Sequence, residues 1–240
     1  MKPVQARHVR STAAQTLSNA LGKALRPFVG KTMSKALVST LSRRTAPYVQ
    51  GARSTMSRLA TQQYVTALEG GKPLKPKKLT RFDEKVWLQS LEKKILSEGP
   101  DSVEVTVTED HIAEVQRAGE HWALDAERGT LIDYAMRDKR FEGWARVDPE
   151  PPTCPFCMVL ISMGPTRTDP QKAHFHAGDT CEVQLVRKGE KDYPGADQVA
   201  EARAKYEKAV KANDGKTDLA GLVKQLKTID PDGAERVETP

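Results

Sequence analysis

The sequence predicts a mainly α-helical protein with three parts: a basic N-terminal helical arm, a helical body and a small α+β module. Three observations favour this class. Apolar residues recur every three to four positions through most of the chain. The first 68 residues contain no Asp or Glu. A cluster of cysteines and histidines lies in a segment rich in Pro and Gly, which has little apolar material for a core of its own.

The bulk composition predicts a modest globular part with helical or flexible extensions. Of the 240 residues 38% are hydrophobic, and the mean hydropathy is −0.58, which is low for one compact globule. No apolar run reaches the roughly 18 residues that a membrane span needs. The start has no apolar signal core, although its acid-poor, Arg- and Ser-rich composition is also typical of a mitochondrial transit peptide. Three cysteines are not a disulfide framework, so a reducing compartment is expected.

The N-terminal segment is expected to form three amphipathic helices. Leucines at every fourth position over residues 17–25 predict the first helix, which Pro27 should stop. Similar apolar stripes over residues 33–41 and 56–68 predict two more, with Pro47 ending the earlier one.

The charge of this arm predicts a negatively charged partner. The first 68 residues hold 11 Lys and Arg, so the rest of the chain carries all 32 acids and 27 of the 38 basic residues, a net charge of −5. A one-sign segment repels itself and is favoured beside something strongly negative, either nucleic acid or an acidic protein surface. The predicted contact residues are Lys2, Arg7, Arg10, Lys23, Arg26, Lys31, Lys35, Arg43, Arg44, Arg53 and Arg58.

Beyond the arm, apolar periodicity and turn residues divide the chain further. A helix is expected over residues 82–95, a weak strand over 103–107 and a long helix from Thr108, its N-cap, toward Arg140. Gly129 is a possible break in that helix. The predicted organisation is an arm over 1–69, a hinge over 70–81, a helical body over 82–147, a Cys/His module over 148–190, C-terminal helices over 191–229 and a disordered tail over 230–240.

The Cys/His module carries the clearest chemical signal. Its pattern is C-x2-C-x18-H-x4-C, made by Cys154, Cys157, His176 and Cys181. A C-x2-C turn places two sulfurs on one side, where Zn²⁺ can take both as thiolates. One imidazole and a third thiolate would close a structural site, which would hold together a segment with little core. His174 is the alternative ligand.

Other interpretations of the module stay open. The C-x2-C pair is also the spacing of a thioredoxin-like redox motif, although the βαβ context of that motif is missing. The cysteines could be ordinary small buried residues and the histidines surface residues. Asp179 could support a ligand from outside the coordination sphere. His111 and His121, ten residues apart on the long helix, are expected on its surface.

Four runs of residues resemble a family of phage proteins. They are RGTLIDYA from Arg128, GWARV from Gly143, CPFCMVLISMGP from Cys154 and the segment from Phe175 to Val183. The family is the F-like minor head (head morphogenesis) family of tailed phages of actinobacteria, whose members are also described as capsid maturation proteases. The similarity covers roughly residues 50–186, and the C-x2-C through Gly-Pro run is its most specific part.

The second segment departs from the family pattern, which is usually F-H-x-H-C-x-C-x-V. Gly178 and Asp179 stand where the family has a histidine and a cysteine. His176 and Cys181 remain, as a four-ligand site with the C-x2-C pair requires. The resemblance implies a virion protein present in few copies, assembled in the host cytoplasm and placed inside the head near the portal, where it contacts DNA.

The residues therefore favour a non-enzymatic minor capsid protein. Its expected partners are the portal or major capsid protein and DNA, and its expected cofactor is structural zinc. One alternative is a capsid maturation protease, but the chain has no G-x-S-x-G motif, and Cys157 with His176 is the one imaginable thiol pair. The other alternative is a nucleic-acid binder built like an enlarged zinc knuckle, for which Phe156 and Phe175 are the only stacking aromatics of the module.

Overall fold

The computed structural model confirms a mainly helical protein with small two-stranded sheets. It describes residues 3–68, 70–77, 82–96, 105–149, 153–169, 173, 175 and 180–234. In chain order the elements are α1 (Pro3–Leu25), η1 (Arg26–Phe28), β1 (Thr32–Met33), α2 (Lys35–Ala67), α3 (Glu84–Ile95), β2 (Val105–Thr106), α4 (Glu109–Arg137), β3 (Phe141–Val147), α5 (Pro155–Ser162), β4 (Glu182–Arg187), α6 (Ala196–Ala212), α7 (Leu219–Ile229) and α8 (Pro231–Ala234). Among the described residues, no helix is both long and apolar enough to cross a membrane.

The chain divides into two compact units, and the division differs from the predicted one. Unit 1 contains the described residues up to Thr130, and unit 2 contains those from Leu131 onward. The basic N-terminal segment is part of unit 1, because its apolar residues share one hydrophobic core with α3 and α4. The N-terminal segment is therefore an integral part of a folded unit and not a separate arm.

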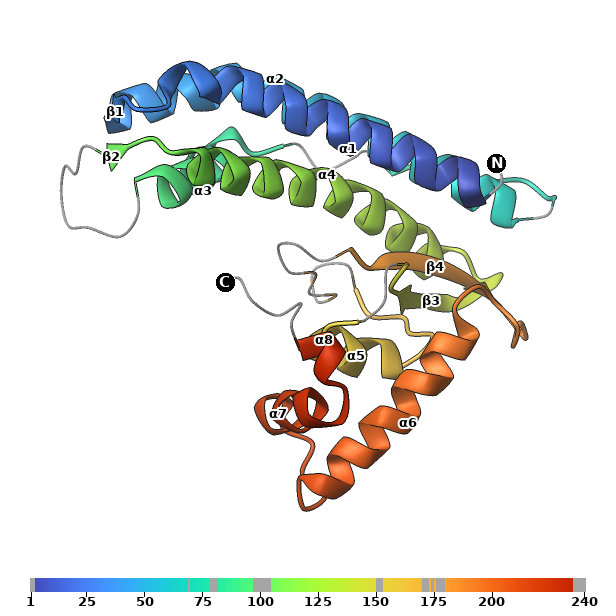
Figure 1. Ribbon diagram of the computed structural model, residues 1–240. Coiled ribbons are helices and arrows are strands. Elements are labelled where there is room, and N and C mark those ends of the chain that lie inside the picture. The colour runs from blue at the N-terminus through green and yellow to red at the C-terminus, as the bar shows by residue number, and fades with distance from the viewer. Residues whose placement is uncertain are drawn as a thin grey trace. The chain divides into compact units, whose positions relative to one another are not determined.

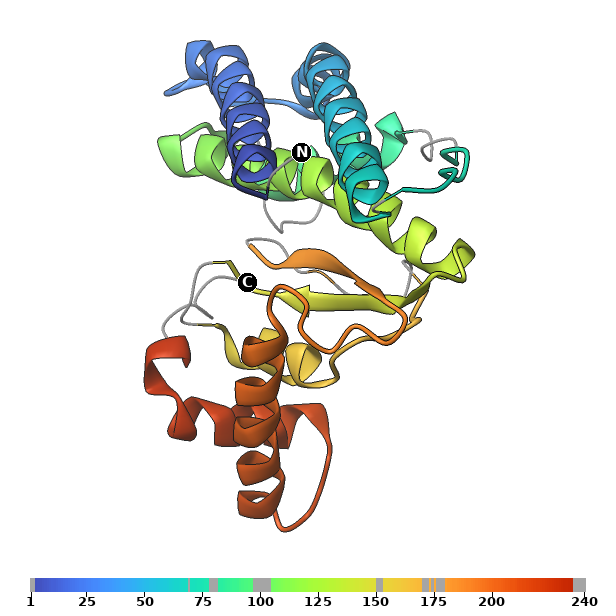
Figure 2. The same ribbon diagram turned by 90° about the vertical axis from the view of Figure 1, so that its right-hand side faces the viewer.

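Unit 1 is built from two layers of helices. α1 and α2 run antiparallel in one layer, and α3 and α4 form the other (Figure 1, Figure 2). The predicted leucine stripe of α1 is buried in this core, and Trp87 of α3 donates its indole N–H to Thr45 Oγ1 of α2 at 2.9 Å. β1 and β2 pair antiparallel, with Met33 opposite Val105, which confirms the weak strand signal.

Pro47 does not end a helix, so the prediction of two helices between residues 33 and 68 was wrong. α2 is 33 residues long and continues through Pro47. Proline removes one hydrogen bond, to the carbonyl of Arg43, but both residues are exposed and water can take the place of the lost donor. Ala46 and Val49, on the opposite side, are buried in the core of unit 1. Packing therefore holds the helix where local propensity is weak.

α4 is also continuous, since Gly129 does not break it. Thr108 acts as the predicted N-cap: its hydroxyl accepts the backbone N–H of His111 at 3.4 Å. His111 Nδ1 in turn accepts the N–H of Thr108 at 3.0 Å, which satisfies a second orphan donor as in a capping box. His111 is thus a capping residue. Further along α4, His121 Nε2 lies 3.2 Å from Oδ2 of Asp125, which is one turn after it.

Gly119 of α4 packs closely against Leu21 of α1, and replacing it should destabilise unit 1. A Cβ at this position would overlap with Leu21 Cδ1, and Leu21 is fully buried. We expect Gly119→Ala to lower the free energy of unfolding by about 1–3 kcal/mol, the usual cost of overpacking. Gly129→Ala on the same helix is the matched control, because nothing lies within 4 Å of its added methyl group.

The control should raise stability by up to about 1 kcal/mol through helix propensity. Urea unfolding followed by circular dichroism measures both effects. Equal midpoints for the two variants would contradict the close approach of α1 and α4.

Unit 2 combines a two-stranded sheet with helices. β3 and β4 pair antiparallel from Phe141 opposite Arg187 to Val147 opposite Glu182. α5, α6 and α7 pack on one another around a second hydrophobic core. α6 and α7 lie within residues 191–229, where C-terminal helices were predicted.

β3 was missed in the sequence, where its residues were assigned to the helical body. Residues 143–146 are all buried, so the strand lacks the alternation of exposed and buried side chains that marks a half-exposed strand. Part of the predicted hinge (residues 78–81) and the tail from residue 235 lie outside the described residues.

Candidate functional site

Two of the predicted ligands lie at the start of α5. Cys154 is the N-cap of this helix, and Pro155 occupies the first turn, where a missing N–H costs nothing. The Cys154 sulfur accepts the backbone N–H of Cys157 at 3.2 Å. The C-x2-C spacing has therefore folded into a helix cap in which a backbone donor points at sulfur. Backbone donors and the helix dipole both favour the negative thiolate form of cysteine.

The third predicted cysteine joins the same hydrophobic cluster. Cys181 directly precedes β4, and Cys154, Cys157 and Cys181 are all buried together with residues of α5, α6 and α7. No disulfide joins these three residues. The structure thus brings the three thiols into one hydrophobic core.

Arg146 is the residue of this site that sequence reasoning missed as a functional group. It lies on β3, and its side chain is buried although it is charged. Its Nη1 is 3.9 Å from Cys157 Sγ, and its Nη2 donates to the carbonyl of Ala173 at 2.6 Å. The guanidinium also lies 3.9 Å from the centre of the Phe175 ring. A cation held beside a sulfur favours the thiolate, whether for metal binding or as a nucleophile.

The structure leaves the complete zinc site as a prediction. His176, its alternative His174 and Asp179 all lie outside the described residues. Within the described residues, no three His, Cys, Asp or Glu side chains form a group placed to hold a metal ion. The donor chemistry of the Cys154–Cys157 pair nevertheless fits Zn²⁺, because a backbone N–H points at the Cys154 sulfur and the Arg146 guanidinium lies beside the Cys157 sulfur.

Two of the predicted binding cations, Arg10 and Arg53, have partners inside unit 1 and are not available as surface contacts. Arg10 forms a bidentate pair with Glu127, with both N–O distances 2.7 Å. Arg53 is buried, donates to the carbonyl of Trp122 at 2.9 Å and lies over the Phe82 and Trp122 rings. Burial lowers the pKa of Arg53 below its usual value, partly offset by Asp125. Both arginines hold unit 1 together.

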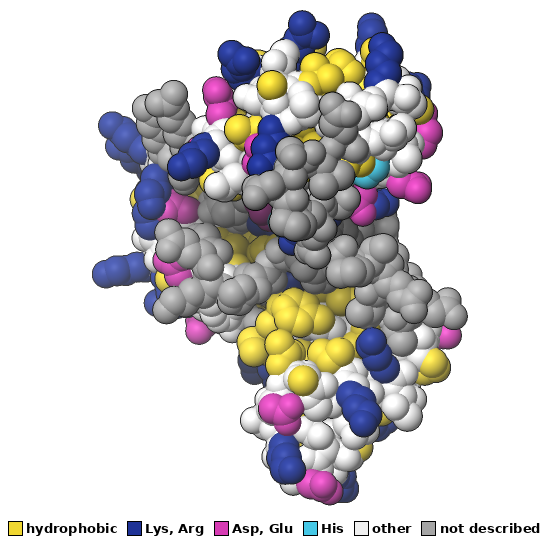
Figure 3. Space-filling view, turned by 90° about the vertical axis from the view of Figure 1, so that its left-hand side faces the viewer, with side chains coloured by type: hydrophobic (Ala, Val, Ile, Leu, Met, Phe, Trp, Pro, Cys, Tyr) yellow, Lys and Arg dark blue, Asp and Glu magenta, His cyan; other side chains and the backbone are white. Residues whose placement is uncertain are grey.

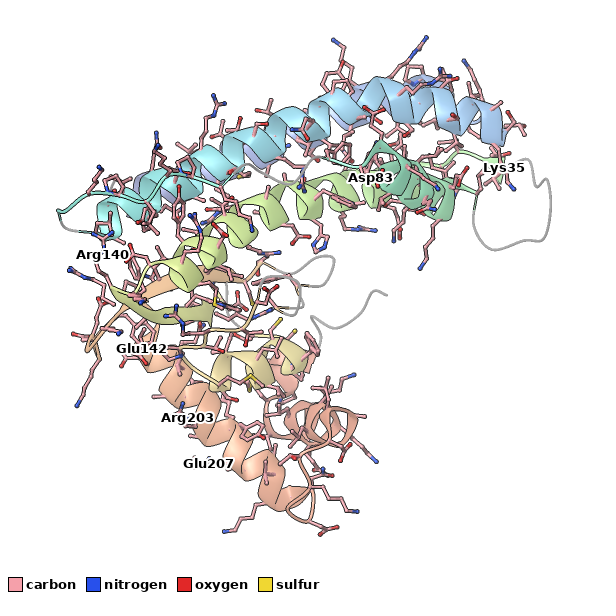
Figure 4. The ribbon with its side chains drawn as sticks, turned by 180° about the vertical axis from the view of Figure 1, so that it is seen from behind. Lys35, Asp83, Arg140, Glu142, Arg203 and Glu207 are labelled. Atoms are coloured by element: carbon pink, nitrogen blue, oxygen red, sulfur yellow. The ribbon has the colours of Figure 1, made fainter. Side chains whose placement is uncertain are left out.

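Seven of the predicted cations are exposed on unit 1. They are Lys23, Arg26, Lys31, Lys35, Arg43, Arg44 and Arg58. Lys and Arg side chains project from the upper part of the face in Figure 3, and Figure 4 shows Lys35 at the start of α2. Among the described residues, none of the seven forms a salt bridge. Lys2 and the side chain of Arg7 lie outside the described part of the chain.

The chain was compared with known proteins in three ways. The comparison with curated proteins and the comparison with solved structures found no match. The comparison with protein families matched residues 2–209 to the family described as VG15 protein. This match covers both units, including the exposed cations and all three buried cysteines. The chain therefore belongs to the VG15 protein family.

Proposed function

We propose that the chain is a non-enzymatic minor capsid (head morphogenesis) protein of a tailed phage. It is assembled in the host cytoplasm, resides inside the head with the portal or major capsid protein, and contacts DNA through unit 1. The similarity of residues 50–186 to F-like minor head proteins supports the phage assignment. The exposed cations of unit 1 support the contact with DNA.

One observation carries the DNA contact: seven exposed cations stand in a part of the chain that contains no acidic residue. Acidic residues are absent up to Leu68, so neither α1 nor α2 can neutralise these charges by pairs within the helix. The leucine stripe of α1 and one face of α2 are buried in the core of unit 1, and the seven cations lie on the exposed surface. A surface of this kind attracts phosphates without reading base sequence.

Salt dependence tests this contact quantitatively. We expect log Kobs for a duplex DNA to fall with log salt, with a slope of about −0.9 per neutralised phosphate. Replacing the seven cations by Gln should therefore flatten the slope by up to about 6. Fluorescence anisotropy over a salt series measures the slope.

A matched control removes the same charge elsewhere. It replaces seven exposed lysines of unit 2 by Gln: Lys188, Lys191, Lys208, Lys211, Lys216, Lys224 and Lys227. The control should keep most of the slope. If both variants lose the same amount, net charge alone attracts the DNA and the unit 1 surface is not the binding site.

The contacts around Cys157 and the nearby Ser162 give little support to the protease alternative. Ser162 is buried and donates to the carbonyl of Val159 at 2.7 Å within its own helix. Cys157 is also buried and lies beside Arg146. If the protein is a thiol protease, Cys157→Ser should abolish cleavage of the capsid protein while the circular dichroism spectrum stays unchanged. Normal cleavage by this variant would exclude Cys157 as the nucleophile.

The zinc-knuckle alternative needs aromatic rings that are open to bases. The Phe175 ring already contacts the Arg146 guanidinium, and its centre lies 6.3 Å from that of Trp144. Phe156 packs against the core of unit 2. These internal contacts leave little ring surface for base stacking, so the basic surface of unit 1 is the better candidate for DNA.

A further inference from the structure

An apolar groove runs between α1 and α2 on unit 1. Its volume is about 630 Å³, and its walls include Val9, Ala13 and Ala20 of α1 and Tyr48, Gly51 and Thr55 of α2. Val9 and Tyr48 are 39% and 51% exposed, so both leave apolar surface open at the groove. Most of the other wall residues are small, so another helix could approach both backbones closely. The stretch from Val9 to Ala20 corresponds to about three helical turns.

Basic residues continue the two walls beyond both ends of the groove. Residues three or four apart share one face of a helix, so Arg44 and Arg58 lie on the same stripe of α2 as Tyr48, Gly51 and Thr55. Lys23 continues the stripe of α1 that contains Ala13 and Ala20. Because α1 and α2 run antiparallel, Lys23 and Arg44 follow the stripes at one end of the groove and Arg58 at the other. All three are exposed.

The walls of the groove contain no negative charge. Neither α1 nor α2 has an acidic residue, so an anionic ligand meets no repulsion from either wall. The groove thus offers an apolar floor about three turns long between positive ends. DNA matches the charge but has no apolar face to fill such a floor, and a neutral apolar helix gains nothing from the ends.

We propose that this groove binds an acidic amphipathic helix of another protein. Apolar residues of that helix would lie on the floor, and Asp or Glu residues near its two ends would face Lys23, Arg44 and Arg58. This mode is the known one in which an amphipathic helix fills an apolar groove, with apolar anchors at positions i, i+3, i+4 and i+7. The proposal goes beyond the contact with DNA and does not depend on it.

Gly51 allows the groove to be filled without damage to the fold. It is exposed in the middle of α2, and a Cβ built there has nothing within 4 Å. Gly51→Leu should therefore occupy the floor of the groove, while Gly51→Ala leaves most of it open. Both replacements favour the helix over glycine, so both variants should melt at or above the temperature of the unchanged protein.

The experiment measures binding of labelled synthetic helical peptides of about four turns by fluorescence anisotropy. The acidic peptide has Leu at i, i+3, i+4 and i+7 and Glu near both ends; its controls carry Lys in place of Glu, or Ser in place of Leu. The full-length protein and Gly51→Ala should bind the acidic peptide at least about tenfold more tightly than either control. Gly51→Leu should lose that preference. The double variant Arg44→Glu with Arg58→Glu should instead bind the peptide with Lys more tightly than the peptide with Glu.

Three results would overturn the proposal. Failure of the acidic peptide to bind the unchanged protein excludes the groove as a site for such a helix. Equal binding to Gly51→Leu and Gly51→Ala shows that surface charge alone attracts the peptide. Self-association that disappears in Gly51→Leu identifies a second copy of the chain as the occupant. Retention of DNA binding by Gly51→Leu separates this site from the proposed DNA contact.

Discussion

Replacing Glu127 by alanine is expected to lower the free energy of unfolding of unit 1 by about 3–5 kcal/mol, the cost of leaving a buried charge without its partner. The Glu127 side chain is only 3% exposed and accepts two hydrogen bonds from Arg10 and a third from Gln63 at 2.8 Å. These contacts tie α1 and α2 to α4. Arg10 is 15% exposed, so without Glu127 it keeps its charge in a largely desolvated position.

A double variant distinguishes the pair from simple packing. Arg10→Met with Glu127→Leu removes both charges and replaces them with apolar side chains of similar size, which is often neutral or stabilising for a buried pair. We expect it to recover most of the stability that Glu127→Ala loses. Urea unfolding of the two variants measures the difference. A Glu127→Ala variant as stable as the unchanged protein would show that the pair is not needed to hold α1 in place.

The helices of this protein were predictable because each carries a local signal. Each signal depends on residues that are close together in the sequence. The examples are the leucine stripe of α1, the Thr108 cap and the Ala-rich composition of α6. Pro47 misled for the same reason: its local signal is a helix end, but burial of Ala46 and Val49 in the core outweighs one lost hydrogen bond.

The roles of the arginines could not be predicted, because their partners are far away in the chain. Arg10 pairs with a residue 117 positions later, and Arg53 donates to one 69 positions later. The absence of acids in the first 68 residues suggested that all 11 cations face outward. The structure shows that arginines of a segment without acids can still pair with a carboxylate and a backbone carbonyl of α4.

The cysteine site was predictable in its donors but not in its surroundings. The C-x2-C spacing identified Cys154 and Cys157, whose arrangement is set by one helix cap. Arg146 reaches Cys157 through β3, a strand without a periodic signal, since both of its faces are buried there. The one available signal was the run GWARV, in which a charged residue stands among small and aromatic ones.

The purified protein is expected to contain one zinc ion per chain, bound by Cys154, Cys157, Cys181 and His176. Zn²⁺ with three thiolates and a neutral imidazole carries one net negative charge, and the buried Arg146 guanidinium would balance it. Structural zinc sites contribute about 10–16 kcal/mol of apparent binding free energy in zinc-finger peptides. A chelator should therefore unfold the region around α5 while unit 1 keeps its helices. Metal analysis and circular dichroism measure the two effects.

Two substitutions at Cys154 separate a metal ligand from a plain buried thiol. A ligand is lost equally in Cys154→Ser and Cys154→Ala, so both variants should purify with at least about tenfold less zinc, because weak sites exchange their metal during purification. A plain small apolar residue is replaced better by alanine than by serine, whose hydroxyl costs about 1–3 kcal/mol when it is buried without a partner. Unchanged stability of Cys154→Ala, together with zinc-free unmodified protein, would assign the three cysteines to packing alone.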